Sequence, residues 1–137
     1  MPPKHVAARP RVLVLSNDNV SWPASDREWT DRMLDHLSTA LTSLGYPHEV
    51  RKVDADLDLL ELYDPREWVI WNWVEELGGR PWTDAEAARA YERRSFAFTG
   101  AGSPALSASI DRLRIKRALV RAGLPTLPGL RLRDPRQ

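Results

Sequence analysis

Short apolar segments alternate with amphipathic segments along this chain, and this alternation constrains the fold more than any other feature. Residues 11–16 (Arg-Val-Leu-Val-Leu-Ser) form a nearly continuous apolar run, and residues 67–72 (Glu-Trp-Val-Ile-Trp-Asn) form a second one. Such runs are typical of strands that are buried on both faces of a parallel sheet. Between them, from Trp29 onward, apolar residues recur at helical spacing, and Gly45 supplies a left-handed helix end.

The rest of the chain continues this pattern. We expect further strands at residues 49–53 and 96–99, with an acidic turn or short helix at residues 54–63 between the first of these and the apolar run at residues 67–72. Thr83 and Glu86 have the spacing of a capping box that opens another helix. This order predicts an α/β fold, a small three-layer Rossmann-like domain with a mainly parallel sheet covered by helices on both faces.

Composition indicates a single domain. The chain has 137 residues, of which 42% are hydrophobic and 28% charged, and this length buries roughly two thirds of the unfolded surface. We expect residues 1–10 to form a disordered tail, residues 11–128 the α/β domain, and residues 129–137 an exit strand. No apolar run approaches the ~20 residues of a membrane span, and no secretory signal is visible, so we expect a cytoplasmic protein without a membrane partner.

Cysteine and histidine usage narrows the chemistry. The sequence has no cysteine, which excludes disulfides and a cysteine nucleophile, and its three histidines are scattered. We therefore expect no metal site within this chain.

Charge is distributed unevenly although the net charge is only +1. Residues 54–92 contain three arginines and eleven carboxylates, a balance of −8, whereas residues 93–137 contain ten basic and two acidic groups, a balance of +8. Either the two parts neutralise each other in the fold, or the basic part meets nucleotide phosphates or an acidic partner. We do not expect a nucleic-acid partner.

Ligands in parallel α/β sheets bind beyond the carboxyl ends of the strands, which directs attention to residues 17–27, 72–80 and 100–103. The first of these loops has no glycine, so a dinucleotide fingerprint is absent after the first strand and a dehydrogenase is excluded. Gly100 and Gly102 precede a predicted helix, where backbone N–H groups can bind an anion. The alternative is that the two glycines only make the turn.

The last predicted helices carry most of the basic charge. Ser103 is the expected cap of the first, with Pro104 at its first position, and Asp111 is the expected cap of the second. Arg112 and Lys116 share one edge of the second helix. Its apolar residues fall at helical spacing and predict a stripe that faces the core: Ile115, Ala118, Leu119 and Ala122.

Several strings resemble the N-terminal, pre-ATP-grasp domain of D-alanine–D-alanine ligases and related ATP-grasp proteins. Residues 26–30 (Asp-Arg-Glu-Trp-Thr) stand where the family has Glu-Arg-Glu-Val-Ser, and residues 98–102 (Phe-Thr-Gly-Ala-Gly) where it has Tyr-Thr-Gly-Ser-Gly. Residues 111–116 (Asp-Arg-Leu-Arg-Ile-Lys) match the pattern Asp-Lys-x-x-x-Lys, and residues 122–127 (Ala-Gly-Leu-Pro-Thr-Leu) match Ala-Gly-Leu-Pro-Thr-Pro. The likeness spans about residues 11–132.

The resemblance implies a carboxylate–amine ligase in which ATP activates a carboxylate as an acyl phosphate that an amine then attacks. By position, Asp26 corresponds to the acid that holds the substrate ammonium, with Glu28 as the alternative, and Arg112, with Lys116, corresponds to the group that reaches ATP phosphate. Aspartate replaces glutamate and arginine replaces lysine at these positions, which weakens the assignment of D-alanine as substrate. The residues alone allow a simpler interpretation. In it, Asp26 or Glu28 only complements the helix dipole, and Arg112 and Lys116 form a solvated face of their helix.

Two hypotheses follow. In the first, the chain is the substrate-side part of such a ligase, a fragment or split subunit whose partner lobe, in cis or in trans, carries the ATP and magnesium sites. The chain alone is then expected to bind neither ATP nor magnesium productively, and its small substrate is an amino acid or another carboxylate. In the second, it is a stand-alone, non-catalytic α/β module that binds a small ligand or a protein surface. Both hypotheses allow the chain to form a homodimer.

Overall fold

The computed structural model of the chain describes residues 9–17 and 21–129. Its strands form one parallel sheet in the order β2-β1-β3-β4. They are β1 (Arg11–Asn17), β2 (His48–Val53), β3 (Trp68–Trp73) and β4 (Ala97–Phe98). The helices are α1 (Ala24–Ser43), the short 3-10 helix η1 (Asp58–Leu62), α2 (Asp84–Arg93), α3 (Ser103–Ser109) and α4 (Arg112–Arg121). The predicted α/β class with a parallel sheet is confirmed.

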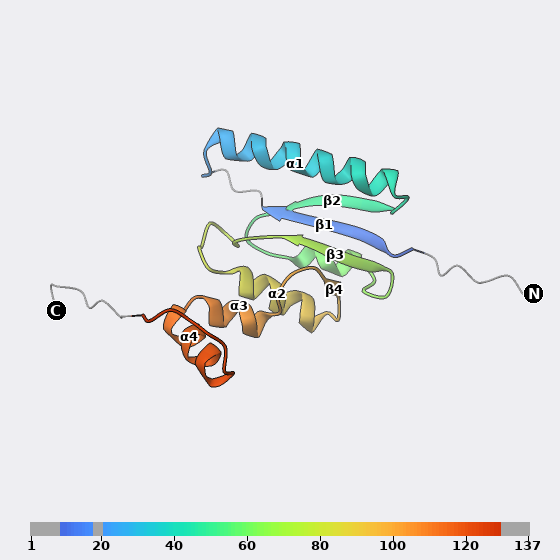
Figure 1. Cartoon of the computed structure of the whole chain (residues 1–137). Helices are drawn as coiled ribbons and strands as arrows, with labels where there is room; N and C mark the ends of the chain where they lie inside the picture. Colours follow the sequence, from blue (N-terminus) through green and yellow to red (C-terminus); the bar gives the residue numbers. More distant parts are fainter. Residues whose placement is uncertain (1–8, 18–20, 130–137) are drawn as a thin grey trace, which may run out of the picture.

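Helices cover both faces of the sheet, as expected for a three-layer domain. Figure 1 shows α1 on one side of the strands and α2 and α3 on the other. Alternate residues of β1 serve the two sides, because successive strand side chains point in opposite directions. Val12 and Val14 pack with Leu34 of α1, whereas Leu13 and Leu15 belong to the larger core cluster that contains α2. The central strand is therefore buried on both faces, which explains its uninterrupted apolar sequence.

Helix α1 begins at Ala24, directly after Pro23 and five positions before Trp29, where the apolar spacing begins. Its first turn carries exposed polar side chains, so no apolar period marks it in the sequence. The early start places Asp26 in the first helical turn, where the helix dipole favours a carboxylate. At the other end, Gly45 has a φ of 72°, which confirms the predicted left-handed end.

Of the three predicted N-terminal helix caps, Asp111 is confirmed, Thr83 is correct in position only, and Ser103 is wrong. Thr83 is the N-cap residue of α2, but its hydroxyl donates to the Arg80 carbonyl and accepts from the Leu77 N–H, so it fixes the preceding turn and makes no capping-box bond. Ser103 is the first residue of α3 and not its cap, because Gly102 occupies the cap position. The third prediction is confirmed, since Asp111 accepts hydrogen bonds from two backbone N–H groups of α4.

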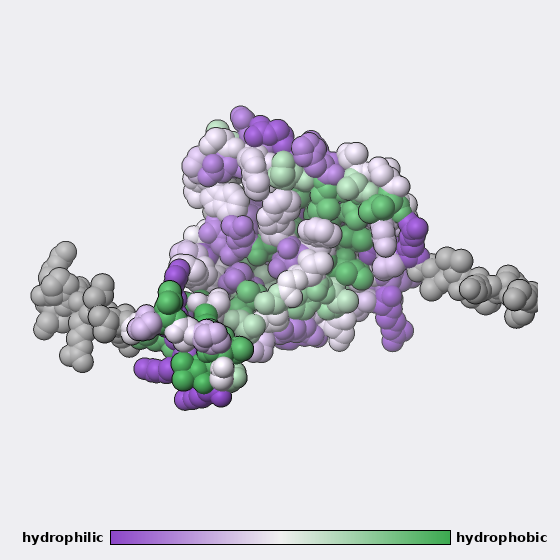
Figure 2. All heavy atoms as spheres, viewed as in Figure 1, coloured by the Kyte–Doolittle hydropathy of each residue, from purple (hydrophilic) through white to green (hydrophobic). Residues whose placement is uncertain are grey.

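The apolar stripe of α4 does not face the core as predicted. No residue of α4 is buried: Ile115 and Leu119 are half-buried, whereas Ala118 and Ala122 are exposed. The reason is that α4, among the described elements, packs only against α3, outside the three layers. Figure 2 shows hydrophobic side chains at the surface of this corner of the molecule, where Figure 1 places α4.

The tryptophans of β3 divide between core and surface. Trp68 is buried as predicted, but Trp71, which we also expected in the core, is 39% exposed. Trp68 belongs to the cluster on the α2 side, so strand alternation directs Trp71 to the opposite face. On that face α1 packs over β1 and contacts β2, and β3 is only partly covered.

The ends of the chain complete the description. Residues 1–8 of the expected tail lie outside the described residues, and the guanidinium of Arg9 lies 5.1 Å from the centre of the Tyr46 ring. Gly129 lies outside any strand, and the remainder of the predicted exit strand falls beyond the described part. Over residues 9–17 and 21–129, none of the helices combines the length and the apolar character needed to cross a bilayer.

Candidate functional site

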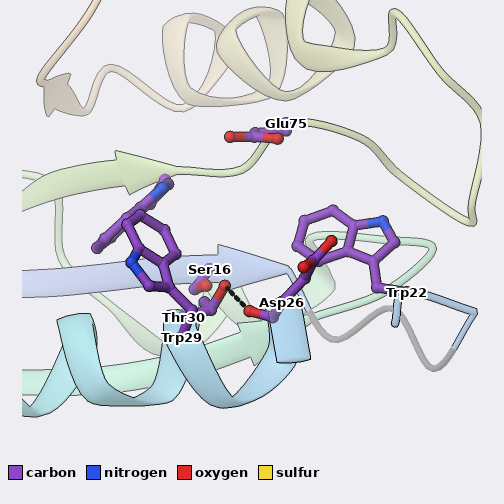
Figure 3. Close-up of a pocket in the computed structure, with 7 residues that line it drawn as sticks. Ser16, Trp22, Asp26, Trp29, Thr30 and Glu75 are labelled. Carbon is purple, nitrogen blue, oxygen red and sulfur yellow. Dashed lines mark hydrogen bonds between the residues drawn. The ribbon is translucent and has the colours of Figure 1, made fainter. Parts of the chain in front are cut away.

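A cavity of about 290 Å³ lies at the carboxyl ends of β1 and β3, on the side of the sheet that α1 covers. Two of the three loops expected to bind ligand, residues 17–27 and 72–80, contribute to it. The seven residues that line the cavity are Ser16, Trp22, Asp26, Trp29, Thr30, Trp73 and Glu75. Figure 3 shows Asp26 between Trp22 and Trp29, with Glu75 facing them from the loop after β3. We call this cavity the strand-end pocket.

Asn17 fastens the loop after β3 to the end of β1. Its side-chain oxygen accepts hydrogen bonds from the N–H groups of Glu75, at 2.7 Å, and Glu76, at 3.4 Å. Its amide nitrogen donates to the Glu76 carbonyl. Because Asn17 is only 6% exposed, these bonds hold the wall of the pocket that carries Glu75 against a buried strand end.

The same loop also holds Trp22. Its indole Nε1 donates to the Glu76 carboxylate at 3.1 Å, which ties the residues before α1 to the loop after β3. Trp22 and Glu75 therefore keep a fixed relation to each other across the opening, although they are 53 positions apart in the sequence.

Helix α1 supplies the other wall. Asp26 lies in its first turn, where the Ser25 hydroxyl donates to its carboxylate at 3.2 Å and the Thr30 hydroxyl donates to its backbone carbonyl at 2.9 Å. Trp29 follows one turn later, and its ring lies 6.1 Å from the Trp73 ring at an angle of 90°. This edge-to-face contact is a favourable aromatic geometry and joins α1 to the end of β3.

The lining is acidic and aromatic. It contains two carboxylates, three indoles and two hydroxyl groups, and no lysine, arginine or histidine is among the lining residues. Indole faces attract cations, and the carboxylates add to this attraction. The pocket is therefore suited to a cationic group and disfavours a phosphate or a free carboxylate.

Of the two acids predicted to hold a substrate ammonium, the structure places only Asp26 in the pocket. Glu28 is exposed on the same helix and does not line the cavity. Glu75, Trp22 and Trp73 were not named as site residues from the sequence. The available signal was their position just beyond the ends of predicted strands. The sequence did not show which loops lie next to each other in the fold.

The two predicted phosphate-binding residues lie four positions apart on α4 and have different surroundings. Lys116 lines a second, open hollow on α4, where its Nζ donates to the Leu127 carbonyl and lies 3.5 Å from the Thr126 hydroxyl. Arg112 is exposed and does not line that hollow. The hollow shares no lining residue with the strand-end pocket, so the acidic and basic candidates belong to different places on the surface.

The glycine turn before α3 is already occupied by a side chain of this chain. Glu92 accepts hydrogen bonds from the Ser103 N–H at 2.7 Å and from the Ser103 hydroxyl at 2.6 Å. The Ser103 hydroxyl and then its N–H lower the pKa of Glu92. Gly100 has a φ of +106°, a conformation that favours glycine, so the turn itself requires this residue. An external anion at Gly100 and Gly102 would have to compete with the Glu92 carboxylate.

Comparisons of the chain with protein-family models, with curated proteins and with solved structures gave no match. Within the described residues, no group of three or more histidines, cysteines and carboxylates is arranged to hold a metal ion. The chemistry of the strand-end pocket therefore has to be inferred from its own residues.

Proposed function

We propose that this chain is the substrate-side domain of an ATP-dependent carboxylate–amine ligase similar to D-alanine–D-alanine ligase, acting with an ATP-grasp lobe in cis or in trans. The observation that carries the proposal is the position of Asp26. The resemblance assigns this residue to the substrate ammonium, and it lines an acidic, aromatic pocket at the carboxyl ends of two parallel strands.

In this proposal the chain binds and orients the substrate. Asp26 and Glu75 attract the ammonium group, and the indole faces add to this attraction. The substrate carboxylate, which the same two acids repel, points out of the pocket toward the partner lobe. ATP, bound with magnesium by that lobe, supplies the phosphoryl group that activates the carboxylate. Positioning of this kind is the larger part of catalysis in such two-substrate reactions.

Arg112 is the residue of this chain proposed to contact ATP phosphate in the complete assembly. It is exposed on α4, at the edge that the resemblance assigns to the nucleotide. Lys116 is bound to the Leu127 carbonyl, so its first role is to hold the chain that follows α4.

The second candidate function is a stand-alone binding module, and one observation favours it. This chain by itself brings two carboxylates and three indoles together at the strand-end pocket. Both candidates predict binding by the isolated chain. Only the ligase predicts ATP-dependent product formation when an ATP-grasp lobe is added.

The experiment that tests the common step is a calorimetric titration of the chain with D-alanine, L-alanine and glycine at low salt. Asp26→Asn should weaken binding at least tenfold, because it removes one of two carboxylates from the pocket. Glu28→Gln is the matched control, two positions away on the same helix and outside the pocket, and it should bind like the unchanged protein. An equal loss in both variants would show only a general charge effect and would contradict an ammonium site at Asp26.

The ligase itself is tested by ADP release with the same amino acids. The chain alone should release no ADP above a protein-free control, and addition of an ATP-grasp lobe should restore release. Binding without any ADP release in the reconstituted mixture would favour the stand-alone module.

A further inference from the structure

Three of the seven residues that line the strand-end pocket are tryptophans. An ammonium group can be held by a single carboxylate, so the acids alone leave this aromatic lining unexplained. Indole has the strongest attraction for cations among aromatic side chains. The number of indoles therefore bears on what kind of cation the pocket accepts.

The rings are arranged around the pocket and not stacked. Trp29 and Trp73 meet at 90°, so their faces have different directions, and Figure 3 shows Trp22 on the other side of Asp26. Trp22 is held in place by its bond to Glu76. A flat ligand would use one ring face at a time, whereas a rounded cationic group contacts faces of different orientation together.

The indole faces also favour a cation that carries methyl groups over one that carries N–H donors. A primary ammonium presents three donors, each of which needs an acceptor when it leaves water. The Asp26 and Glu75 carboxylates can accept from such donors, whereas the three indole faces give an N–H donor no strong acceptor. A quaternary ammonium carries its charge on methyl groups, which contact indole faces and need no acceptor.

Charge sets the orientation of the ligand. Asp26 and Glu75 together offset a positive group and repel a negative one, and no basic residue is among the lining. The acid end of a zwitterion must therefore lie outside the pocket. We propose that the strand-end pocket selects a small carboxylic acid that bears a trimethylated ammonium, that is, a betaine. This inference rests on the proposed function, in which the pocket holds the ammonium end of the substrate.

The test is a methylation series with a constant acid end: glycine, N-methylglycine, N,N-dimethylglycine and glycine betaine, each titrated calorimetrically into the full chain. Affinity should rise along the series, by about tenfold or more from glycine to glycine betaine, which is the effect of one to two well-formed cation–indole contacts. The compound 3,3-dimethylbutanoate has the shape of glycine betaine without the positive charge, and it should not bind.

Variants separate the aromatic contribution from simple apolar contact. Trp29 is 50% exposed, so its replacement leaves the core intact. Trp29→Leu keeps an apolar side chain and should lower the affinity for glycine betaine by about 3- to 30-fold, whereas Trp29→Phe should retain more of it. Trp82→Leu is the matched control, because Trp82 is 68% exposed and does not line the pocket.

Each outcome decides between the proposals. A flat or falling methylation series, or equal binding by Trp29→Leu, would overturn the betaine inference and leave the ammonium site of the proposed function in place. Absence of binding by every member of the series would overturn both. Sedimentation with phosphatidylcholine vesicles distinguishes a lipid headgroup from a free molecule, and retention of the chain by vesicles in preference to glycine betaine would contradict a small substrate.

Discussion

The side chain of Asn17 and the backbone of Glu75 join the ends of two neighbouring strands, through a hydrogen bond of 2.7 Å from the Glu75 N–H to the Asn17 oxygen. Asn17 itself does not line the strand-end pocket. It acts as a positioning residue, since it fixes the loop from which Glu75 and the partner of Trp22 project.

Replacement of Asn17 by alanine should therefore affect both stability and binding. The change removes the side chain that accepts from the Glu75 and Glu76 N–H groups and donates to the Glu76 carbonyl beside a buried strand end. A buried group that loses its hydrogen bond costs about 1–3 kcal/mol in unfolding free energy. Urea unfolding measures this loss, and calorimetry should show weaker binding of amines in the same variant.

Ser43→Ala provides the control for Asn17. The Ser43 hydroxyl lies at the far end of α1 and bonds only the Thr39 carbonyl of its own helix. The Ser43→Ala change should leave the unfolding free energy and the affinity for amines nearly unchanged. If Asn17→Ala lost stability but kept full affinity for amines, Glu75 would not depend on Asn17 for its position.

The sequence predicted the sheet and the general place of the site, and its failures have a common physical cause. Apolar runs identified the strands, and the rule that ligands bind beyond strand ends led to residues 17–27 and 72–80. Asp26 followed from the resemblance. What could not be predicted depends on pairing between distant segments, as in the hydrogen bonds of Asn17 to Glu75 and of Trp22 to Glu76.

The same cause explains the errors in helix caps and in burial. Thr83 and Ser103 have the local pattern of caps, but Thr83 bonds the preceding turn and Ser103 bonds Glu92 from another helix. The apolar stripe on α4 has the correct period for a buried face. Periodicity predicts which side of a helix is apolar, but it does not predict which element covers that side. Among the described helices and strands, α3 alone packs against α4.

Glu92 should make the stability of α3 depend on pH. Its native pKa is lowered from the ordinary value of 4.5 by the Ser103 hydroxyl and N–H, so the native state favours the ionised form. The stabilisation is present above pH 4.5 and disappears as the pH falls through the lowered native pKa. Unfolding free energies of the unchanged protein and Glu92→Gln should differ most at neutral pH, and the difference should close toward about pH 2.

Glu28→Gln serves as the reference in this pH series. Glu28 is exposed on α1, and its replacement should produce no difference that depends on pH in this way. A gap for Glu92→Gln that stays constant from neutral to acidic pH would mean that the shape of the side chain, and not its charge, supports α3.

The Tyr91 hydroxyl should contribute to the stability of the fold through one hydrogen bond. Its side chain is fully buried, and its hydroxyl donates to the Asn72 side chain at 3.0 Å. Burial raises the pKa of Tyr91, so the hydroxyl stays protonated and remains a donor at neutral pH. Tyr91→Phe should cost about 0.5–1.5 kcal/mol of unfolding free energy, the usual net value of one such bond. A calorimetric or urea unfolding series measures it, and a loss above about 3 kcal/mol would indicate a rearranged core.

Replacement of Lys116 and replacement of Arg112 should change different properties, because of these two residues only Lys116 contacts the segment that follows α4. Its Nζ donates to the Leu127 carbonyl, and its methylenes lie close beside Gly129. In the chain without nucleotide, Lys116→Met should speed amide hydrogen exchange at residues 124–129, by about 2- to 10-fold for the loss of one hydrogen bond. Arg112→Ala should leave this exchange unchanged.

For ATP affinity, measured with an ATP-grasp lobe present, we expect the effect at Arg112. Arg112→Ala should weaken ATP binding by about 1.5–3 kcal/mol, the range for hydrogen bonds to charged groups, and Arg114→Ala on the same helix should change it little. Both are exposed arginines, so Arg114 controls for the general positive charge of α4. Equal, small effects of the two arginine variants on ATP affinity would identify the basic side of α4 as an ordinary solvated face. The exchange result for Lys116→Met would stand independently, because it is measured without ATP and depends only on the contact between Lys116 and the Leu127 carbonyl.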